Sequence, residues 1–351
     1  MKKELYYIAF LAILLVSCEE IYTPDLEESQ SMMVVESQIT NDQDHNFVKL
    51  TKSLDFYSTD QAEKIEGAQV ELIESEGSSM KGIESSTGYF TFSDTPIPGK
   101  TYYLRIIWDN NIYESEKVVM PPLPTIDTLY TNHAVEKSYT NDIFGKLVEV
   151  ETPGRNICID APITSKLEYY RFDWRAIMEW TYSFPLGPTY NGWIPYYNTG
   201  NFNLAGPKQY SVSEKIQSHP VLFLGYDSEA YLDSVTQLYV GWIVIIDEYG
   251  TTKDSYDYHE GLNEQFSAEG SLFDPVSTQV YGNIKCTSDP TKLVLGFFDL
   301  NSYRQYRYYI YLGSNESSKL VQRQINRYLD IPNRGYVVNR FPDFWEYYWG
   351  F

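Results

Sequence analysis

Residues 101–115 read TYYLRIIWDNNIYES, and this stretch predicts two β-strands joined by a tight turn. Its first part, 102–108, is rich in aromatic and β-branched residues, which favour strands. Asp109-Asn110-Asn111 follows, and these residue types are typical of hairpin turns. The chain then returns through a second β-prone run at 112–120. A hairpin of this composition indicates a β-rich fold.

Short β-prone segments separated by turn residues continue upstream of this hairpin. Residues 33–39, 48–54 and 69–74 each have the composition of a strand. The cluster Pro-Ile-Pro-Gly at 96–99 marks a turn. Because no helical period interrupts these strands, residues 32–120 are predicted to form a β-sandwich.

Three short motifs in this region resemble immunoglobulin-like modules of the carboxypeptidase-regulatory or transthyretin-like type. They are IEGAQV at 65–70, Gly88-Tyr89, and GKTYYL at 99–104. In those modules a Gly-Ala pair opens a strand, and a later G-x-x-Y-x-L strand packs its aromatic ring inward. The resemblance implies an N-terminal immunoglobulin-like β-sandwich.

A proline-rich segment separates this region from the rest of the chain. Residues 121–124 read PPLP, and three prolines in four positions exclude a central strand or a helix interior. We therefore place a stiff linker at 121–124 and a larger, β-rich domain at 125–351. The strands predicted in that domain are 167–174, 176–184, 235–247, 292–299 and 306–312.

Two segments of this second domain predict helices. The first, 211–219, is short and ends before Pro220. The second, 254–268, offers Asp254 or Ser255 as a helix cap, and its apolar stripe consists of Tyr258, Leu262 and Phe266. The predicted fold class is therefore mainly β, with an immunoglobulin-like sandwich followed by a larger β-rich domain that contains a few short helices.

The N-terminus predicts a lipoprotein signal peptide at 1–17. Lys2 and Lys3 precede an apolar run at 6–16 of roughly 11 residues, against the about 20 that a membrane-spanning helix needs. The run ends in Leu15-Val16-Ser17-Cys18, which resembles a bacterial lipobox. The resemblance implies cleavage before Cys18, acylation of that residue, and a permanent anchor in a lipid membrane.

An acidic tether is predicted at 18–31, where Glu19 and Glu20 follow the lipidated cysteine. This start resembles the signal that exports Bacteroidota lipoproteins to the outer face of the outer membrane. A solvated tether is an alternative that is compatible with export. The expected membrane partner is lipid, held through acylated Cys18, because an anionic surface repels so acidic a body.

Three motifs follow the second predicted helix: GSLFDP at 270–275, GNI at 282–284 and LGFF at 295–298. With these motifs, the chain resembles a large lipoprotein family known as domain of unknown function 4249, in order and spacing over nearly all of its length after the signal peptide. Members pair an immunoglobulin-like module with a β-rich C-terminal region behind a lipoprotein signal. They commonly occur beside TonB-dependent outer-membrane receptors, so the resemblance implies an accessory role in uptake.

The residues in these motifs suit structural roles. Phe273-Asp274-Pro275 fits a turn, because Asp can bond backbone amides and Pro fixes the geometry. Gly282-Asn283 fits a bulge or a strand entry that needs a positive φ. We therefore expect both segments to form part of the architecture and not a ligand site.

Composition excludes two classes of protein. The chain has 351 residues, with 48 acidic against 27 basic side chains and a net charge of −21, so it lacks the basic surface that nucleic-acid binding needs. Hydrophobic residues make up 43% and aromatic residues 16%, which is too apolar for a disordered acidic chain. We therefore expect a folded, anionic protein that binds no nucleic acid.

The sequence contains no recognisable catalytic or metal-binding motif. The histidines are not spaced as metal ligands, and neither a nucleophile elbow nor a phosphate-binding loop occurs. We therefore expect no enzyme activity, catalytic residue, metal or cofactor. Besides Cys18 there are Cys158 and Cys286, and two alternatives remain open. They form a disulfide, or they are two independently buried thiols.

Aromatic residues form two candidate contact sites for a ligand or partner. The first is Trp193, Tyr196 and Tyr197, in a Gly- and Pro-rich stretch at 185–197 that predicts a long, irregular loop. The second is the C-terminal stretch at 344–349, where a strand would place Trp345, Tyr347 and Trp349 on one side. Exposed aromatics suit binding surfaces, and the alternative is that they cover the domain's own core.

These features predict an outer-membrane lipoprotein, lipid-anchored and facing the cell exterior. It would act as a binding or accessory subunit of a TonB-dependent nutrient-uptake receptor. A structural or adhesive surface lipoprotein is the alternative. A surface glycan or peptide hydrolase is a third hypothesis, which no motif supports.

The predicted location depends on Cys18. The variant Cys18→Ala should be an uncleaved or soluble form without acyl label, because the residue that accepts the lipid is gone. Metabolic labelling with a fatty acid, followed by fractionation, measures this. Full labelling of the variant would contradict the anchor.

Overall fold

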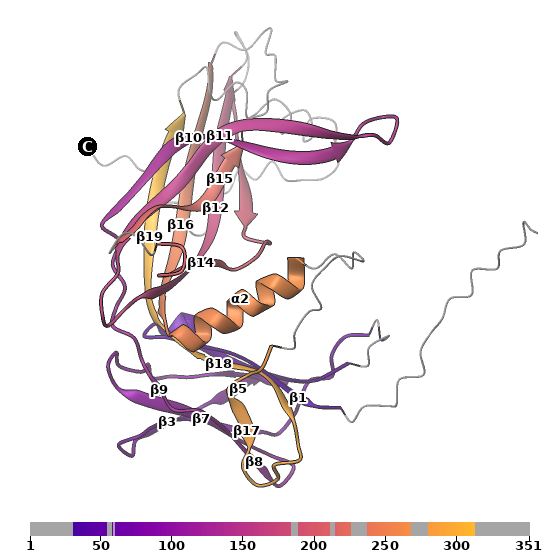
Figure 1. Cartoon of the computed structure of the whole chain (residues 1–351), viewed down its shortest axis with the longest axis vertical. Helices are drawn as coiled ribbons and strands as arrows, with labels where there is room; N and C mark the ends of the chain where they lie inside the picture. Colours follow the sequence, from indigo (N-terminus) through magenta and orange to yellow (C-terminus); the bar gives the residue numbers. More distant parts are fainter. Residues whose placement is uncertain are drawn as a thin grey trace, which may run out of the picture.

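The structure is a computed structural model that describes residues 31–54, 58, 60–183, 189–210, 215–225, 237–267 and 280–312. Within these ranges the chain forms four β-sheets and one α-helix, which confirms the mainly β fold class. The sheets pair around two separate hydrophobic cores. We call the pair that contains the N-terminal strands the first body and the other pair the second body; Figure 1 shows the first body below the second.

The first body contains two sheets. Its strands are β1 (Met33–Ile39), β2 (Phe47–Lys52), β3 (Gln69–Glu74), β4 (Ser79–Lys81), β5 (Ile83–Ser86), β6 (Tyr89–Thr91), β7 (Thr101–Trp108), β8 (Asn111–Ser115), β9 (Val118–Val119), β17 (Ile284–Cys286) and β18 (Val294–Leu300), with a 3-10 turn η1 (Gln43–His45) after β1. One sheet has the order β18-β1-β2-β6-β5, and the other has β17-β8-β7-β3-β4 with β9 beside β7. Alternate residues of the longer strands, such as β1, β3 and β7, fill the core, for example Val35, Leu72 and Leu104.

The hairpin predicted at 101–115 is present. Trp108 of β7 pairs with Asn111 of β8, so Asp109 and Asn110 form a two-residue turn. Both turn residues are left-handed, with φ of 49° and 57°. Two consecutive left-handed residues define the turn type that matches the twist of a β-hairpin, and Asp and Asn tolerate this conformation better than other non-glycine residues.

The first body is not continuous in sequence, so the predicted division at the prolines is wrong in one respect. Strand β18 pairs in parallel with β1, and β17 pairs with β8. Residues 284–300, which the sequence assigned to the second domain, therefore complete both sheets of the first. The reason is that β18 supplies Phe298 and Leu300 to the first core, and no local pattern reveals which sheet an apolar strand joins.

Two glycines allow β18 to lie against its neighbours. A Cβ on Gly296 (φ +95°) would lie 1.9 Å from the carbonyl oxygen of Val35, and a Cβ on Gly282 would lie 1.7 Å from the carbonyl oxygen of Gly296. Asn283 adds two hydrogen bonds to the backbone of Phe298, with distances of 3.0 Å and 2.7 Å. The architectural role predicted for Gly282-Asn283 is confirmed, although Gly282 is needed for close approach and not for a positive φ.

The second body also contains two sheets. Its strands are β10 (Thr128–Asn141), β11 (Leu147–Pro162), β12 (Tyr169–Ser183), β13 (Thr189–Tyr197), β14 (Asn203–Ala205), β15 (Lys215–Gly225), β16 (Gln237–Thr251) and β19 (Ser302–Leu312). One sheet has the order β10-β11-β15, and the other has β13-β12-β16-β19 with β14 beside β12. Ile157 and Ile159 of β11 face Phe172 of β12 and Val244 of β16 in the shared core.

One predicted helix and one predicted loop are strands in the structure. Residues 215–219 of the predicted helix belong to β15, which pairs with β11 around a bulge, where Ser218 is left-handed (φ 52°). Residues 189–197 of the predicted loop form β13, which pairs with β12. Both strands are at sheet edges, where Pro220 and Pro195 need no partner for the missing N–H.

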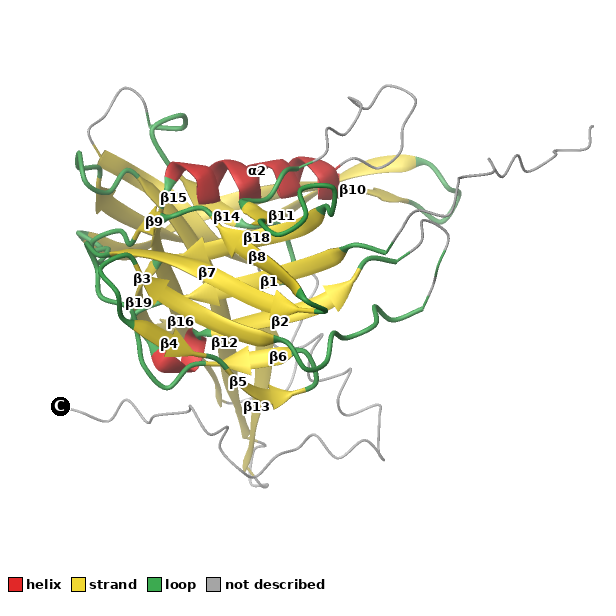
Figure 2. Cartoon of the chain, turned by 90° about the horizontal axis from the view of Figure 1, so that it is seen from below, coloured by secondary structure: helices red, strands yellow, loops and turns green. Residues whose placement is uncertain are grey.

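Helix α2 (Lys253–Ser267) lies between the two bodies in Figure 1 and along one side of the stacked strands in Figure 2. It confirms the helix predicted at 254–268, although the cap is Thr252, whose Oγ1 accepts from the amide of Ser255 at 3.2 Å. The predicted apolar stripe is only partly correct. Tyr258 stacks on Phe297 at 4.5 Å, but Phe266 is exposed. The fully buried side chains are Ser255, Tyr256 and His259.

The chain also passes directly between the bodies near its end. Strand β18 of the first body ends at Leu300, and β19 of the second begins at Ser302. The intervening Asn301 donates its backbone N–H to the carbonyl oxygen of Ile39 at 2.9 Å. Asn41 then bonds both backbone groups of Tyr303, at 3.1 Å and 2.7 Å. This second, hydrogen-bonded connection means that the bodies are not joined by a proline linker alone.

Gly296→Ala should destabilise the protein by at least about 2 kcal/mol, because it combines a strained φ with a clash against the backbone of β1. Gly99→Ala is the matched control, since Gly99 also has a positive φ (+88°) but has nothing within 4 Å of the added carbon. Urea unfolding of both variants measures the difference. Equal losses of stability would show that close approach at Gly296 contributes nothing.

Candidate functional site

Most of the predicted functional residues lie outside the described ranges. These are the lipidation site Cys18, the export residues Glu19 and Glu20, and the C-terminal aromatics Trp345, Tyr347 and Trp349. The turn predicted at 273–275 also lies outside them. Trp193 is on β13, where its backbone pairs with Glu179 of β12.

The aromatic pair at the end of β13 divides between the core and the surface. The ring of Tyr196 lies 5.1 Å from that of Trp242, and the side chain packs against the core of the second body. Tyr197, the next residue, is 59% exposed. Alternation along a strand therefore separates the two, and Tyr197 alone of this pair is available for contact.

The two cysteines are free thiols, so the alternative of a Cys158–Cys286 disulfide is wrong. Cys158 is buried on β11 of the second body. Cys286 is buried on β17 in the core of the first body. Because the two thiols lie in different bodies, they cannot approach to bonding distance. Burial raises the pKa of the Cys158 thiol, which makes that thiol unreactive.

A buried polar network joins α2 to both bodies. Ser255 donates its hydroxyl to Asp299 of β18 at 2.5 Å, and Asp299 also lies 3.4 Å from the guanidinium of Arg171 on β12. Arg171 donates to Gln38 of β1 at 2.9 Å. His259 lies on the same side of α2, with Nε2 3.9 Å from Asp299. Sequence analysis missed this network, because its residues come from four separate segments.

These residues include a serine, a histidine and an aspartate, but their geometry is not that of a catalytic triad. In a triad the histidine accepts from the serine and donates to the aspartate. Here the serine hydroxyl donates directly to Asp299, while Nδ1 of His259 lies 2.7 Å from the backbone oxygen of Ser255. Burial also lowers the pKa of His259. Since all three side chains are buried, we assign the network a structural role.

Glu248 of β16 is completely buried on the side of the sheet that faces the core of the second body. Burial raises its pKa to about 8, and the nearby Tyr306 and Arg304 offset this only in part. The side chain is therefore protonated at neutral pH. His219 is the opposite case, because burial lowers its pKa to about 4 and keeps the ring neutral. Its Nδ1 lies 2.8 Å from the hydroxyl of Tyr210, and its Nε2 lies 2.5 Å from Oδ1 of Asn203.

The most prominent surface feature is a two-stranded arm. Among the residues that the structure describes, β11 pairs with β15 from Gly154 onward, and residues 135–153 pair within the β10–β11 hairpin. Figure 1 shows this part projecting sideways from the second body. Gly154 marks its base, where an added Cβ would lie 2.5 Å from the ring of Phe223 on β15. The sequence did not predict these two strands.

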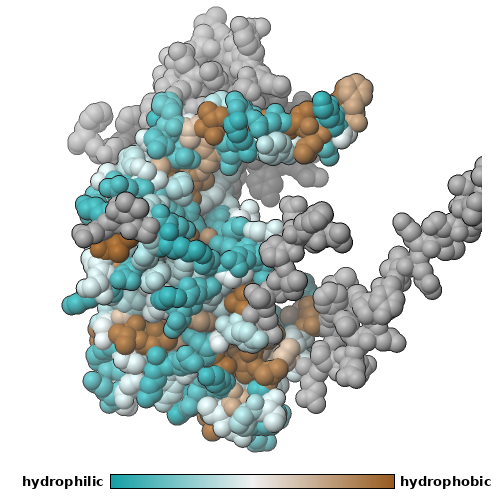
Figure 3. All heavy atoms as spheres, in the orientation of Figure 1, coloured by the Kyte–Doolittle hydropathy of each residue, from teal (hydrophilic) through white to brown (hydrophobic). Residues whose placement is uncertain are grey.

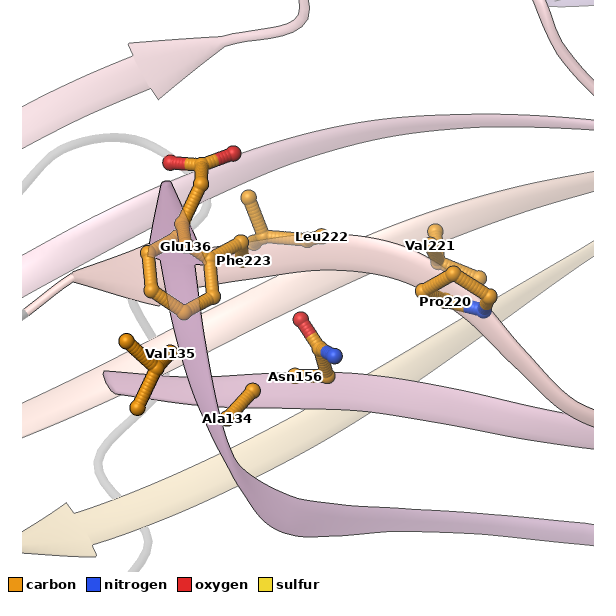
Figure 4. A pocket seen from close by; sticks show the side chains of 8 residues that line it. All are labelled: Ala134, Val135, Glu136, Asn156, Pro220, Val221, Leu222 and Phe223. Carbon is orange, nitrogen blue, oxygen red and sulfur yellow. The ribbon is translucent and has the colours of Figure 1, made fainter. Parts of the chain in front are cut away.

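A shallow hollow of about 310 Å³ lies at the base of the arm. Figure 4 shows its lining, in which β10 and β15 contribute side chains on either side of Asn156. The lining residues are Ala134, Val135, Glu136, Asn156, Pro220, Val221, Leu222 and Phe223. A larger hollow of about 610 Å³ lies at the junction of the bodies and is lined partly by Pro121, Pro122 and Tyr169.

The tip of the arm is a rigid turn with exposed apolar side chains. Oδ1 of Asp142 accepts from the amides of Phe144 and Lys146, both at 2.9 Å, and Gly145 is left-handed with a φ of 78°. These bonds hold the turn while Ile143 and Phe144 point into solvent, with exposures of 93% and 87%. Figure 3 shows hydrophobic residues at this outer end of the arm.

Side chains of the arm itself hold its two strands together. Lys137 of β10 lies between Glu149 and Glu151 of β11, at 2.8 Å and 3.0 Å. Tyr139 donates its hydroxyl to Glu149 at 3.0 Å. A single exposed ion pair contributes little to stability, but three contacts across one hairpin favour one arrangement of its two strands. The arm can therefore present its tip in a defined orientation.

Within the described ranges, no group of three or more His, Cys, Asp or Glu residues is placed to hold a metal ion. The same part of the chain contains no helix with the length and apolar character needed to cross a membrane. The arm exposes large apolar side chains on a hydrogen-bonded turn, and such a surface suits contact with another molecule.

Glu248→Gln should flatten the dependence of stability on pH. In the unfolded chain this carboxyl titrates near 4.5, whereas in the folded protein it titrates at about 8, so folding takes up a proton between these values. The stability gained from the neutral form is complete below about pH 4.5 and is lost as the pH rises toward 8. The wild type should therefore show an extra slope of up to about 1.4 kcal/mol per pH unit across this window.

Urea unfolding at several pH values measures this slope. The exposed Glu168 is the matched control, and Glu168→Gln should keep the slope of the wild type. If Glu248→Gln keeps the same slope as the wild type, the carboxyl is ionised in the folded protein.

Comparison with known proteins agrees with one resemblance noted in the sequence. No curated protein and no solved structure matches the chain. One family profile matches residues 19–307, which is most of the chain and includes the first body, α2, the arm and the second body except for the end of β19. The chain therefore belongs to the family described as Domain of unknown function (DUF4249).

Proposed function

We propose that this protein is a lipid-anchored, surface-exposed outer-membrane lipoprotein that acts as a binding or accessory subunit of a TonB-dependent nutrient-uptake receptor. The single observation that favours a binding role is the arm, whose rigid turn exposes Ile143 and Phe144 to solvent. Large apolar side chains held in solvent are a common mark of a contact surface. The lipobox-like Cys18, the acidic start of the tether and the family resemblance support the location and the kind of partner.

In this proposal the lipid anchor confines the protein near its receptor. The 14 residues at 18–31 span at most about 50 Å when fully extended, so the start of the folded part stays within that distance of the membrane. Confinement of this kind raises the effective concentration of the arm at the receptor, and a weak contact then suffices. The protein would capture a nutrient or position the receptor without chemical change to either.

The proposal holds that the chain is not an enzyme and needs no cofactor. The buried Ser255, His259 and Asp299 fit this view, because a substrate would have to open the junction between the bodies to reach them. A structural or adhesive surface lipoprotein is the second candidate. The same arm favours it, since an exposed apolar tip can also contact the cell's own envelope.

Affinity purification of the full-length tagged chain from detergent-solubilised outer membranes tests the proposal. We expect co-purification of a TonB-dependent barrel protein, and Cys18→Ala should reduce it because the unanchored chain is no longer confined to the membrane. A tagged lipoprotein from the same membrane that lacks this domain is the control. Recovery of envelope components with no such barrel would favour the adhesive role.

A further inference from the structure

We infer that the tip of the β10–β11 arm inserts into a recess on the surface of a protein partner. This recess is apolar where it admits Ile143 and Phe144, and basic side chains border it. The inference rests on the proposed function and adds the chemistry of the partner surface. It concerns a protein partner and not a lipid bilayer. Three features of the arm lead to this assignment.

The first feature is preorganisation of the tip. Asp142 holds the turn with its side chain, and its backbone adds two further bonds, from Gly145 at 2.9 Å and to Lys146 at 2.8 Å. These four hydrogen bonds hold the tip in this conformation before any partner is present. Binding then orders little of the chain, and this is the property that gives affinity to a small contact.

The second feature is the extent of the apolar surface. The hairpin register pairs Leu147 with Asn141 beside the turn and Tyr139 with Glu149 one pair further along the same face. The exposures of Tyr139 and Leu147 are 65% and 63%. Together with Ile143 and Phe144 they form a tip cluster of four residues. A cluster with one rigid tyrosine and one phenylalanine is typical of the central contacts of protein interfaces.

The third feature is the charge of the whole arm. Residues 135–151 contain four acidic side chains (Glu136, Asp142, Glu149 and Glu151) and two basic ones (Lys137 and Lys146), a net of −2. The whole chain carries −21. An arm of this sign is repelled by an anionic bilayer, whereas a basic protein surface would attract it and guide its approach.

A photo-cross-linking phenylalanine analogue at position 144 of the full-length, lipidated chain tests this in intact cells. The same analogue at Tyr281, which is 80% exposed but outside the arm, is the matched control. We expect position 144 to cross-link to one TonB-dependent receptor, at an apolar recess with Lys or Arg around it, and position 281 to give no such product. Cross-links from 144 mainly to lipid, or none, would overturn the inference.

Three variants then examine the individual features by co-purification of that receptor. Ile143→Ser with Phe144→Ser should reduce recovery at least tenfold, whereas the control pair Ile83→Ser with Leu293→Ser, also exposed, should not. Asp142→Ala, which keeps both apolar residues but releases the turn, should reduce recovery to an intermediate level. At low salt, Glu136→Lys should reduce recovery of the receptor more than the exposed control Glu76→Lys does.

The outcomes separate the inference from the proposed function. If the receptor is recovered equally with the wild type and the tip variants, the inference that the tip inserts into the receptor is refuted while the accessory role stands. If no receptor is recovered with the wild type, both fail. Binding of the wild-type chain to vesicles of phosphatidylethanolamine and phosphatidylglycerol, lost in the tip variant, would assign the tip to lipid and also refute the inference.

Discussion

The buried carboxylate of Asp299 is the group on which the arrangement of the two bodies depends. It lies on the last strand of the first body, accepts from Ser255 of α2 and faces Arg171 of the second body. A carboxylate in this position without partners would be costly, so the helix and both bodies are held in one arrangement. Arg171 also stacks over the ring of Tyr249 at 4.3 Å, and Tyr303 connects the same region to Asp247 at 2.6 Å. The direction of the arm relative to the first body depends on this junction, because the arm extends from the second body.

Local features of the fold could be predicted from the sequence, and long-range ones could not. Strands β1 and β3 have the predicted bounds, because each buries alternate residues and is bordered by turn residues. The turn at Asp109 and Asn110 was predictable from two residue types alone. The pairing of β1 with β18 lets Ser37 donate its hydroxyl to the carbonyl oxygen of Phe297, which lies 260 residues further along the chain. An apolar strand fits many sheets equally well by pattern, so its place is decided by packing that a single sequence does not display.

The candidate site was harder to predict than the fold. The outer part of the arm is exposed on both faces, so it lacks the alternation that marks a half-buried strand, and the turn residues Asp142 and Gly145 were its only local indication. The stretch around Trp193 was predicted to be a loop because of its Gly and Pro content, yet an edge strand tolerates both. Helix α2 was found from its apolar stripe, but its fully buried face includes Ser255 and His259, whose partners lie on other segments. Polar burial of this kind has no signature in local composition.

The late strands β17 and β18 also affect how the protein reaches its folded state. Synthesis proceeds from the N-terminus, so β1 and β8 emerge long before the two strands that pair with them at 284–300. Until then each keeps an open edge, and open edges can pair with the wrong chain. The N-terminal sandwich is thus unable to mature as an autonomous unit while the rest is made. Its assembly waits until residue 300 has been made, and a product terminated before that point would expose unpaired backbone that aggregation or proteolysis can exploit.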